Sequence, residues 1–249
     1  MLEHHGVLFW PVLIAIALVI GISKSGIPGA GILAITWLPL VMPARASTGV
    51  ILPLLIVGDI AAVTFLGRHA VWRHLWKLLP CAMVGVVAGW LVLGHVDDRQ
   101  LRPMIGAIIL AILAFGAWRD RRDNGAAHIP EGWWFAVLMG LAGGFTTMLS
   151  NAAGPIMIVY LLAMRLPKEA FVGTGAWYFL LMNAFKVPFS ANLGLINAES
   201  LHINLLLVPA ILAGSLLGLF LLKRLPEKGF NLAVQSFAAL GALRLLLPA

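Results

Sequence analysis

Apolar runs along this chain come in two lengths, and the short ones occur in adjacent pairs. The pairs are residues 7–22 with 27–42 and residues 133–148 with 152–164. A helix needs about 20 apolar residues to cross a hydrocarbon core of about 30 Å, so each short run falls below a comfortable span. We interpret each pair as two half-helices that enter a membrane, break at a glycine-rich segment and leave on the side they entered. If the runs instead crossed fully, the parity of crossings would be the same, and the chain would have about ten spans.

Three longer apolar runs follow each hairpin, so the second half of the chain repeats the first. These runs are residues 47–66, 78–94 and 103–118, and then residues 169–189, 201–222 and 229–247. A basic, aromatic connector at residues 68–77 is predicted to be a short interfacial segment. The pattern predicts an all-α polytopic membrane protein made of two repeats, residues 1–122 and 123–249.

Residues at matching places support the repetition. Pro43 corresponds to Pro167 and Asp59 to Asn183 at one constant spacing. Glycines continue the correspondence at a slightly larger spacing, Gly85 with Gly214 and Gly89 with Gly218. Small residues four apart on a membrane helix are more often packing positions than chemical ones, and we interpret these glycines in that way.

Basic residues decide how the repeats are oriented. With each hairpin counted as no net crossing, one side holds Arg68, Arg73, Lys77, Arg119, Arg121, Arg122, Arg165, Lys168, Lys223, Arg224 and Lys228. The opposite side holds Arg45, Arg99, Arg102 and Arg244. Because Lys and Arg are concentrated in cytoplasmic loops, the larger group is predicted to be cytoplasmic. Each half then crosses an odd number of times, so the repeats are inverted, and the protein is a multi-pass protein of the cytoplasmic (inner) membrane with both termini outside.

Composition excludes several other classes of protein. With 61% hydrophobic and 11% charged residues, the chain is far more apolar than a soluble globule. The net charge of +7 follows from the basic loops, so we expect the lipid bilayer and no nucleic acid as a partner. Cys81 is the only cysteine, and no Cys/His pair has metal-ligand spacing, so we expect no cofactor and no metal. Association into a homo-oligomer is left open.

The first glycine-rich break, residues 21–31, carries a lysine between two serines. A lysine at membrane depth costs about 2.5–3.5 kcal/mol on insertion scales and usually marks a pathway or binding site. The alternative is that the long side chain of Lys24 extends to the membrane interface. Half-helices that begin near Ile27 and Asn151 would direct their positive ends into one cavity, which favours an anion site. The candidate binding residues here are Ser23, Lys24, Ser25, Gly26 and Gly29.

The second break offers neutral hydrogen-bond donors. Pro155 at the start of a helix fixes the break and leaves the neighbouring donors without helical partners. Thr146 is as well explained by a bond back to its own helix backbone. The candidate binding residues of this break are Thr147, Ser150, Asn151 and Gly154.

Asp59 lies in the middle of a long run, and its repeat mate Asn183 lies one helical turn before Lys186. A carboxylate at this depth is a candidate coupling group of a proton-coupled transporter. The alternative is a pair of Asp59 with Lys186 or with Asn183 that ties the two halves together. Both interpretations stay open, and all three residues are candidates for coupling or for contact between the repeats.

The motif Gly-Phe-Thr-Thr-Met-Leu-Ser-Asn-Ala-Ala-Gly-Pro at residues 144–155, together with the repeated break, run and proline turn, resembles the sulfite exporter TauE/SafE family of membrane permeases. The resemblance covers nearly the whole chain. It departs from the family in the first break, where Lys24 and Pro28 interrupt the usual glycine run. The resemblance implies transport of small sulfur-containing anions such as sulfite, sulfoacetate or other organosulfonates, with thiosulfate uptake in some members.

We therefore expect a secondary transporter, not an enzyme, that exports such an anion by alternating access around the two breaks. No Gly-x-x-x-x-Gly-Lys-Ser/Thr loop is present for direct use of ATP. Export follows from family analogy alone. The alternatives are an importer or channel for a related anion such as thiosulfate and, less favoured, an intramembrane enzyme acting on a lipid phosphate. Such an enzyme would need a base or metal ligands beside Asp59, and no His accompanies it.

Overall fold

The computed structural model describes residues 9–31, 33–34, 38, 44–93, 133–151 and 153–246. Within these residues all the regular structure is helical, and no strand is present. The elements are α1 (Phe9–Ser25), α3 (Ala44–Leu66), the 3-10 turn η3 (Gly67–His69), α4 (Trp72–Leu93), α6 (Trp133–Ser150), α7 (Gly154–Ala163), α8 (Lys168–Asn192), α9 (Ala198–Arg224) and α10 (Glu227–Leu246). The all-α prediction is confirmed, whereas the predicted span at residues 103–118 lies outside the described residues.

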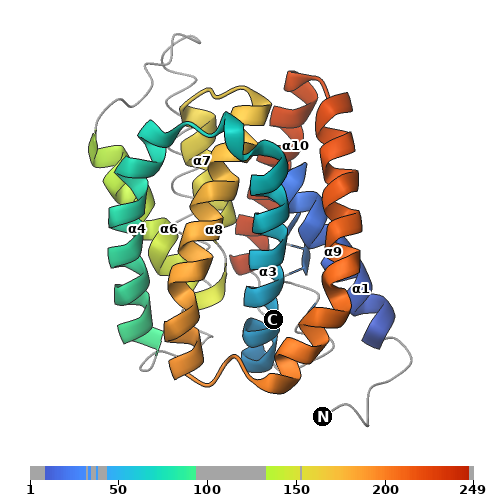
Figure 1. Cartoon of the computed structure of the whole chain (residues 1–249). Helices are drawn as coiled ribbons and strands as arrows, with labels where there is room; N and C mark the ends of the chain where they lie inside the picture. The colour runs from blue at the N-terminus through green and yellow to red at the C-terminus, as the bar shows by residue number, and fades with distance from the viewer. Residues whose placement is uncertain are drawn as a thin grey trace.

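The long helices stand side by side in a single bundle (Figure 1). Three of them are long and apolar enough to cross a membrane, at Val50–His69, Trp72–Val92 and Ser200–Arg224. The described hairpin helices are shorter, with 17 residues in α1, 18 in α6 and 10 in α7. The predicted contrast between short hairpin helices and long spans is thus present in the described part of the chain.

Each hairpin region returns the chain to the end of the bundle from which it started. In Figure 1, α1 and α3 both begin toward the lower end, whereas α6 and α8 both begin toward the upper end. The two hairpin regions therefore enter the bundle from opposite ends. Inverted repeats require this arrangement, but correspondence of the complete halves stays a prediction.

The first helix of each half packs on a helix of the other half. The most extensive packing joins α4 with α6 and α1 with α9, and α3 packs against α8 between these pairs. A Cβ atom at Gly85 would meet the carbonyl oxygen of Leu141, and one at Gly214 would meet that of Leu18. The two glycines thus allow close backbone approach in both pairs, as the packing interpretation predicted.

The predicted interfacial connector at residues 68–77 is wrong in part, because only its beginning is a separate element. The segment forms η3 and then the first turns of α4, which continues through Pro80. Leu75, Leu78 and Leu79 are buried, whereas Trp72 and Trp76 are exposed one turn apart. This is the spacing of an amphipathic helix, so the aromatic composition indicated an interface while the periodicity already indicated α4.

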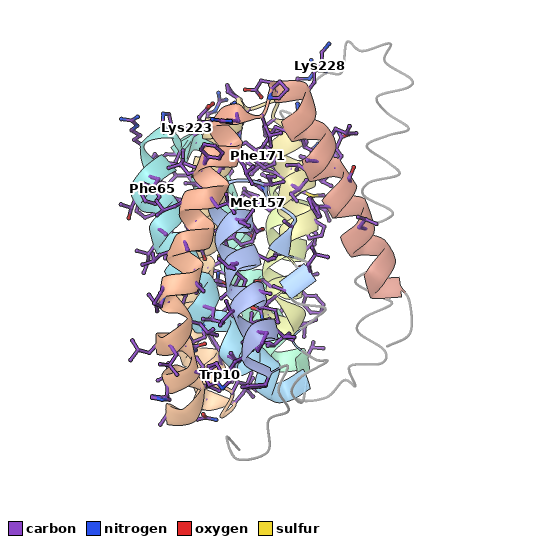
Figure 2. The ribbon with its side chains drawn as sticks, turned by 90° about the vertical axis from the view of Figure 1, so that its right-hand side faces the viewer. Trp10, Phe65, Met157, Phe171, Lys223 and Lys228 are labelled. Carbon is purple, nitrogen blue, oxygen red and sulfur yellow. The ribbon has the colours of Figure 1, made fainter. Side chains whose placement is uncertain are left out.

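The surface of the bundle is that of a membrane protein. Exposed apolar side chains run along α9 and α4, including Leu205, Leu216, Phe220, Val84 and Leu91. Basic residues cluster at the upper end, where Figure 2 shows Lys223 and Lys228, whereas Trp10 lies toward the other end. A lipid-facing apolar band between polar ends accounts for both features, and the chain is located in a membrane.

Candidate functional site

A cavity of about 90 Å³ lies where the two helix breaks meet α3 and α8. Six of the predicted binding residues line it, namely Ser23, Lys24, Gly29, Thr147, Asn151 and Gly154. Asn183 of α8 also lines it. The structure therefore brings residues from both breaks to one cavity, and anion binding by them stays a prediction.

Lys24 extends from the last turn of α1 toward the middle of α3. Its Nζ lies 2.7 Å from Oδ1 of Asp59, and its side chain is 11% exposed. The same Nζ lies 4.3 Å from the centre of the Phe179 ring, an attractive cation–π arrangement. Lys24 is thus held inside the protein, in contrast to the alternative that its side chain reaches the membrane interface.

Asp59 is completely buried and lies behind Lys24, outside the cavity lining. Its Oδ2 accepts a hydrogen bond of 2.7 Å from Nδ2 of Asn183. The structure therefore contains the contact between α3 and α8 through Asn183 that the sequence left open as one alternative, and the coupling role of Asp59 stays a prediction. The ion pair with Lys24 was not predicted. The repeat relates equivalent positions of the two halves, and it does not show which non-equivalent residues are in contact.

Lys186 makes no hydrogen bond to Asp59, contrary to one of the predicted pairs, and instead holds the second break. Its Nζ donates to the carbonyl oxygen of Thr147 at 3.0 Å, to Oγ1 of Thr147 at 3.0 Å and to Oδ1 of Asn151 at 2.7 Å. The residue is 2% exposed. Asp59 already has Lys24 and Asn183 as partners, so the ammonium group of Lys186 has a different set of acceptors.

The second break owes its shape to three residues. Asn151 has a φ of 56°, a left-handed conformation that asparagine adopts more readily than most residues other than glycine. Pro155 lies in the first turn of α7, where its missing N–H costs no helical hydrogen bond. A Cβ at Gly154 would meet no atom within 4 Å, so this glycine borders open space. The break is thus fixed by its own sequence and leaves its backbone accessible from the cavity.

Thr146 does not contribute to the cavity. Its Oγ1 donates to the carbonyl oxygens of Ala142 at 2.8 Å and Gly143 at 3.2 Å. These are the bonds back to the helix backbone that the sequence offered as the alternative role.

Two of the predicted binding residues, Ser25 and Gly26, are not part of the cavity lining. Ser25 is buried, and its hydroxyl has no hydrogen-bond partner within the described structure. Gly26 faces the backbone of Gly218 on α9, where a Cβ would collide, so it is a packing position. Ser150 ends α6, and its side chain lies outside the described residues.

Much of the remaining wall is apolar, and sequence reasoning missed it. It comes from α7 and α8 and includes Met157, Leu161, Phe171 and Phe179. Figure 2 shows Met157 and Phe171 nearer to the end that carries Lys223 and Lys228 than to the end of Trp10. The small residues Gly175 and Ala176, which leave room for the cavity, were the sequence signal for the contribution of α8.

The polar groups of the cavity wall are of a kind that binds anions. No group of three or more His, Cys, Asp or Glu that could hold a metal is found among the described residues. The polar part of the wall instead offers an ammonium group, hydroxyls and an amide. Such groups bind oxyanions by charge-assisted hydrogen bonds.

Comparison with known protein families gives one match. The model of the family described as sulfite exporter TauE/SafE matches residues 13–245, which is nearly the whole chain. No curated protein and no solved structure gives a significant match. The matched range includes both breaks, the helices between them and every described residue of the cavity wall. The chain therefore belongs to the sulfite exporter TauE/SafE family.

Proposed function

We propose that this protein is a secondary transporter that exports a small sulfur-containing anion across the cytoplasmic membrane and binds it in the cavity between the two breaks. Membership of a transporter family supports the class of activity. The observation that carries the site is Lys24, a cation inside the bundle that lines a cavity bordered by both breaks. A buried cation beside open space is an economical binding group for an anionic substrate.

The anion would bind at the polar part of the wall. Lys24 supplies the charge, Ser23, Thr147 and Asn151 supply neutral donors, and Gly29 and Gly154 allow approach to the backbone. Because the other wall is apolar, the cavity suits an anion with an organic part, such as an organosulfonate, at least as well as bare sulfite.

Asp59 is the proposed coupling group. Lys24 borders the cavity and Asp59 does not, so an entering anion competes with the carboxylate of Asp59 for the ammonium group. An unpaired carboxylate at a fully buried position is costly, so Asp59 would take up a proton when Lys24 binds the anion in its place. Asn183 and Lys186 are the other polar groups that act on Asp59, and they would keep it in place through the exchange.

Alternating access would use the two halves, residues 1–122 and 123–249, as inverted repeats. The α1–α9 and α6–α4 contacts make each hairpin part of a tightly packed pair, and the cavity lies between these pairs and the central helices. Rocking of the pairs about α3 and α8 would expose the cavity to one side and then the other. The basic end with Lys223 and Lys228 would face the cytoplasm.

An intramembrane phosphatase is less well supported. Asp59 is occupied by Lys24 and Asn183, and no second carboxylate or histidine forms a metal-binding group with it in the described structure. Hydrolysis of a lipid phosphate requires a general base, a nucleophile or a metal at the reacting atoms.

Flux of radiolabelled sulfite and sulfoacetate in proteoliposomes tests the proposal, with and without a pH gradient. We expect saturable flux that responds to the gradient and is lost in Lys24→Ala. Lys168→Met is a matched control, because this lysine binds the carbonyl oxygens of Leu222 and Leu225 away from the cavity. Absence of flux for every sulfur anion would overturn the substrate class, and normal flux in Lys24→Ala would overturn the site. Flux without saturation would instead support a channel, and uptake driven inward would support an importer.

A further inference from the structure

Lys186 is a buried cation whose bonds all go to neutral groups. Its three ammonium hydrogens are matched by three acceptors, two on Thr147 and one on Asn151. In the described part of the chain, the carboxylate of Asp59 is paired with Lys24, not with Lys186. The positive charge of Lys186 is therefore solvated by dipoles, and no carboxylate in contact with it balances the charge.

The side chains of Thr147 and Asn151 that accept from Lys186 can also donate, and both residues line the cavity. A threonine hydroxyl accepts through its oxygen and still has one hydrogen to donate. An asparagine that accepts through Oδ1 still has two hydrogens on Nδ2. By engaging the oxygen of each group, Lys186 leaves the hydrogens of Thr147 and Asn151 for an acceptor in the cavity, and the oxygens of an anion are acceptors of this kind.

The charges around the cavity give the same result. Lys24 is paired with Asp59, so Lys24, Asp59 and Lys186 together carry one positive charge in excess whenever Lys186 is protonated. The ammonium group of Lys186 contacts Thr147 and Asn151, and these two residues line the cavity. The excess charge therefore lies directly behind this part of the cavity wall.

We propose that Lys186 is a positioning residue of the anion site, which never touches the anion but aims the donors of Thr147 and Asn151 at it and supplies the net positive charge that one negative charge on the substrate neutralises. This inference rests on the proposed function and extends it. It assigns to the second break a cation that acts through neutral groups, whereas Lys24 at the first break acts by direct contact. Before Asp59 takes up a proton, one negative charge on the substrate balances the charges of Lys24, Asp59 and Lys186.

A purely structural role as a tether fits Lys186 less well. Lys168 is an example of a structural tether. Its Nζ donates to the carbonyl oxygens of Leu222 and Leu225 at the end of α9. That site is at an end of the bundle, where water can share the charge. At a position 2% exposed, a neutral amide would hold the break at lower desolvation cost than an ammonium group. The charge itself is therefore the feature that needs an explanation.

Binding of sulfite and of methanesulfonate to the purified full-length protein, measured by calorimetry in detergent, tests this inference without reliance on transport. Lys186→Met removes the charge and the bonds. Asn151→Asp keeps an acceptor for Lys186 and tolerates the left-handed backbone, but it loses the Nδ2 donors and cancels the charge. We expect both variants to bind at least about tenfold more weakly than the wild type, the loss of a charge-assisted bond. Lys168→Met is expected to bind as the wild type does.

Thermal unfolding of the same samples separates positioning from support of the fold. Asn151→Asp creates an ion pair with Lys186, so its midpoint should stay at or above that of the wild type while its affinity falls. If Lys186 served only as a tether, a variant that keeps the stability of the wild type would also keep its anion affinity. Wild-type affinity in Asn151→Asp would overturn the inference and leave the proposed function standing, whereas no binding of either anion by the wild type would overturn the proposed function itself. If Lys186→Met does not fold, the anion affinity and thermal midpoint of Asn151→Asp test the inference.

Discussion

Nζ of Lys24 and Oδ1 of Asp59 lie 2.7 Å apart, and this pair joins the end of α1 to the middle of α3. Lys24 borders the cavity, whereas Asp59 is completely enclosed by protein. A substrate that enters the cavity therefore meets the cation first and can replace the carboxylate as its partner. Each of the following predictions tests a consequence of this arrangement or of the packing that supports it.

Asp59→Asn should lower stability and raise anion affinity at the same time. Removing one member of a buried ion pair costs about 3–5 kcal/mol, because Lys24 is left without its counter-charge. An anion then restores that charge without competition from Asp59. We expect sulfite or methanesulfonate to raise the thermal midpoint of the variant more than that of the wild type, and flux to lose its response to a pH gradient. Equal anion protection of the two proteins would contradict the exchange.

Lys24→Met combined with Asp59→Asn should separate stability from binding. Lys24→Met alone leaves a buried carboxylate unpaired and is expected to be destabilised by about 3–5 kcal/mol. The double variant removes both charges, so most of this loss should be recovered in chemical unfolding. Transport should stay absent in the double variant, because the cation at the cavity is still missing. Recovered transport would show that Lys24 serves the fold alone.

Thr147→Ser and Thr147→Val form a matched pair at the second break. Serine keeps the hydroxyl that accepts from Lys186 and lines the cavity, whereas valine has the shape of threonine and no hydroxyl. We expect Thr147→Ser to retain anion affinity and Thr147→Val to lose about tenfold in calorimetry. If the two variants bind equally, the hydroxyl of Thr147 is not part of the site.

Gly85→Ala and Gly214→Ala should each destabilise the bundle by about 1–3 kcal/mol, because the new methyl group would press on a carbonyl oxygen of α6 or α1. Gly229→Ala is the control, since its nearest neighbour, Cγ of Pro226, would lie 3.4 Å from the new atom. Thermal unfolding in detergent gives the comparison. A similar loss at Gly85 and Gly214 is the outcome that equivalent repeats require, and a loss at only one of them would count against the equivalence.

The elements that could be predicted from the sequence are those fixed by local chemistry. The start of α7 was placed within a few residues, because Pro155 favours the first turn of a helix, whereas Gly143 and Gly144, which were predicted to begin the break, lie inside α6. Asn151 could be assigned to a cavity because irregular backbone inside a membrane needs one, and Thr147 lies one helical turn before it in α6. These inferences require no knowledge of how the helices are rotated about their axes.

The contacts that could not be predicted depend on that rotation. The partner of Asp59 is set by the faces that α1, α3 and α8 turn toward one another, and sequence spacing does not fix these faces. For the same reason, Ser25 and Gly26 could not be distinguished from Ser23 and Lys24, although the former pair lies apart from the cavity lining. The sequence showed that Asp59 is a carboxylate at depth with two lysines, Lys24 and Lys186, at similar depth, but it did not show which of them Asp59 pairs with.

The packing of α1 on α9 also has a consequence for biosynthesis. Leu18 and its packing partner Gly214 are separated by most of the length of the sequence. During synthesis α1 is therefore made well before α9, and the first of the described helices that it can pack on is α3. The most extensive contact of α1 thus forms late, and a ribosome that stalls before α9 leaves α1 without it.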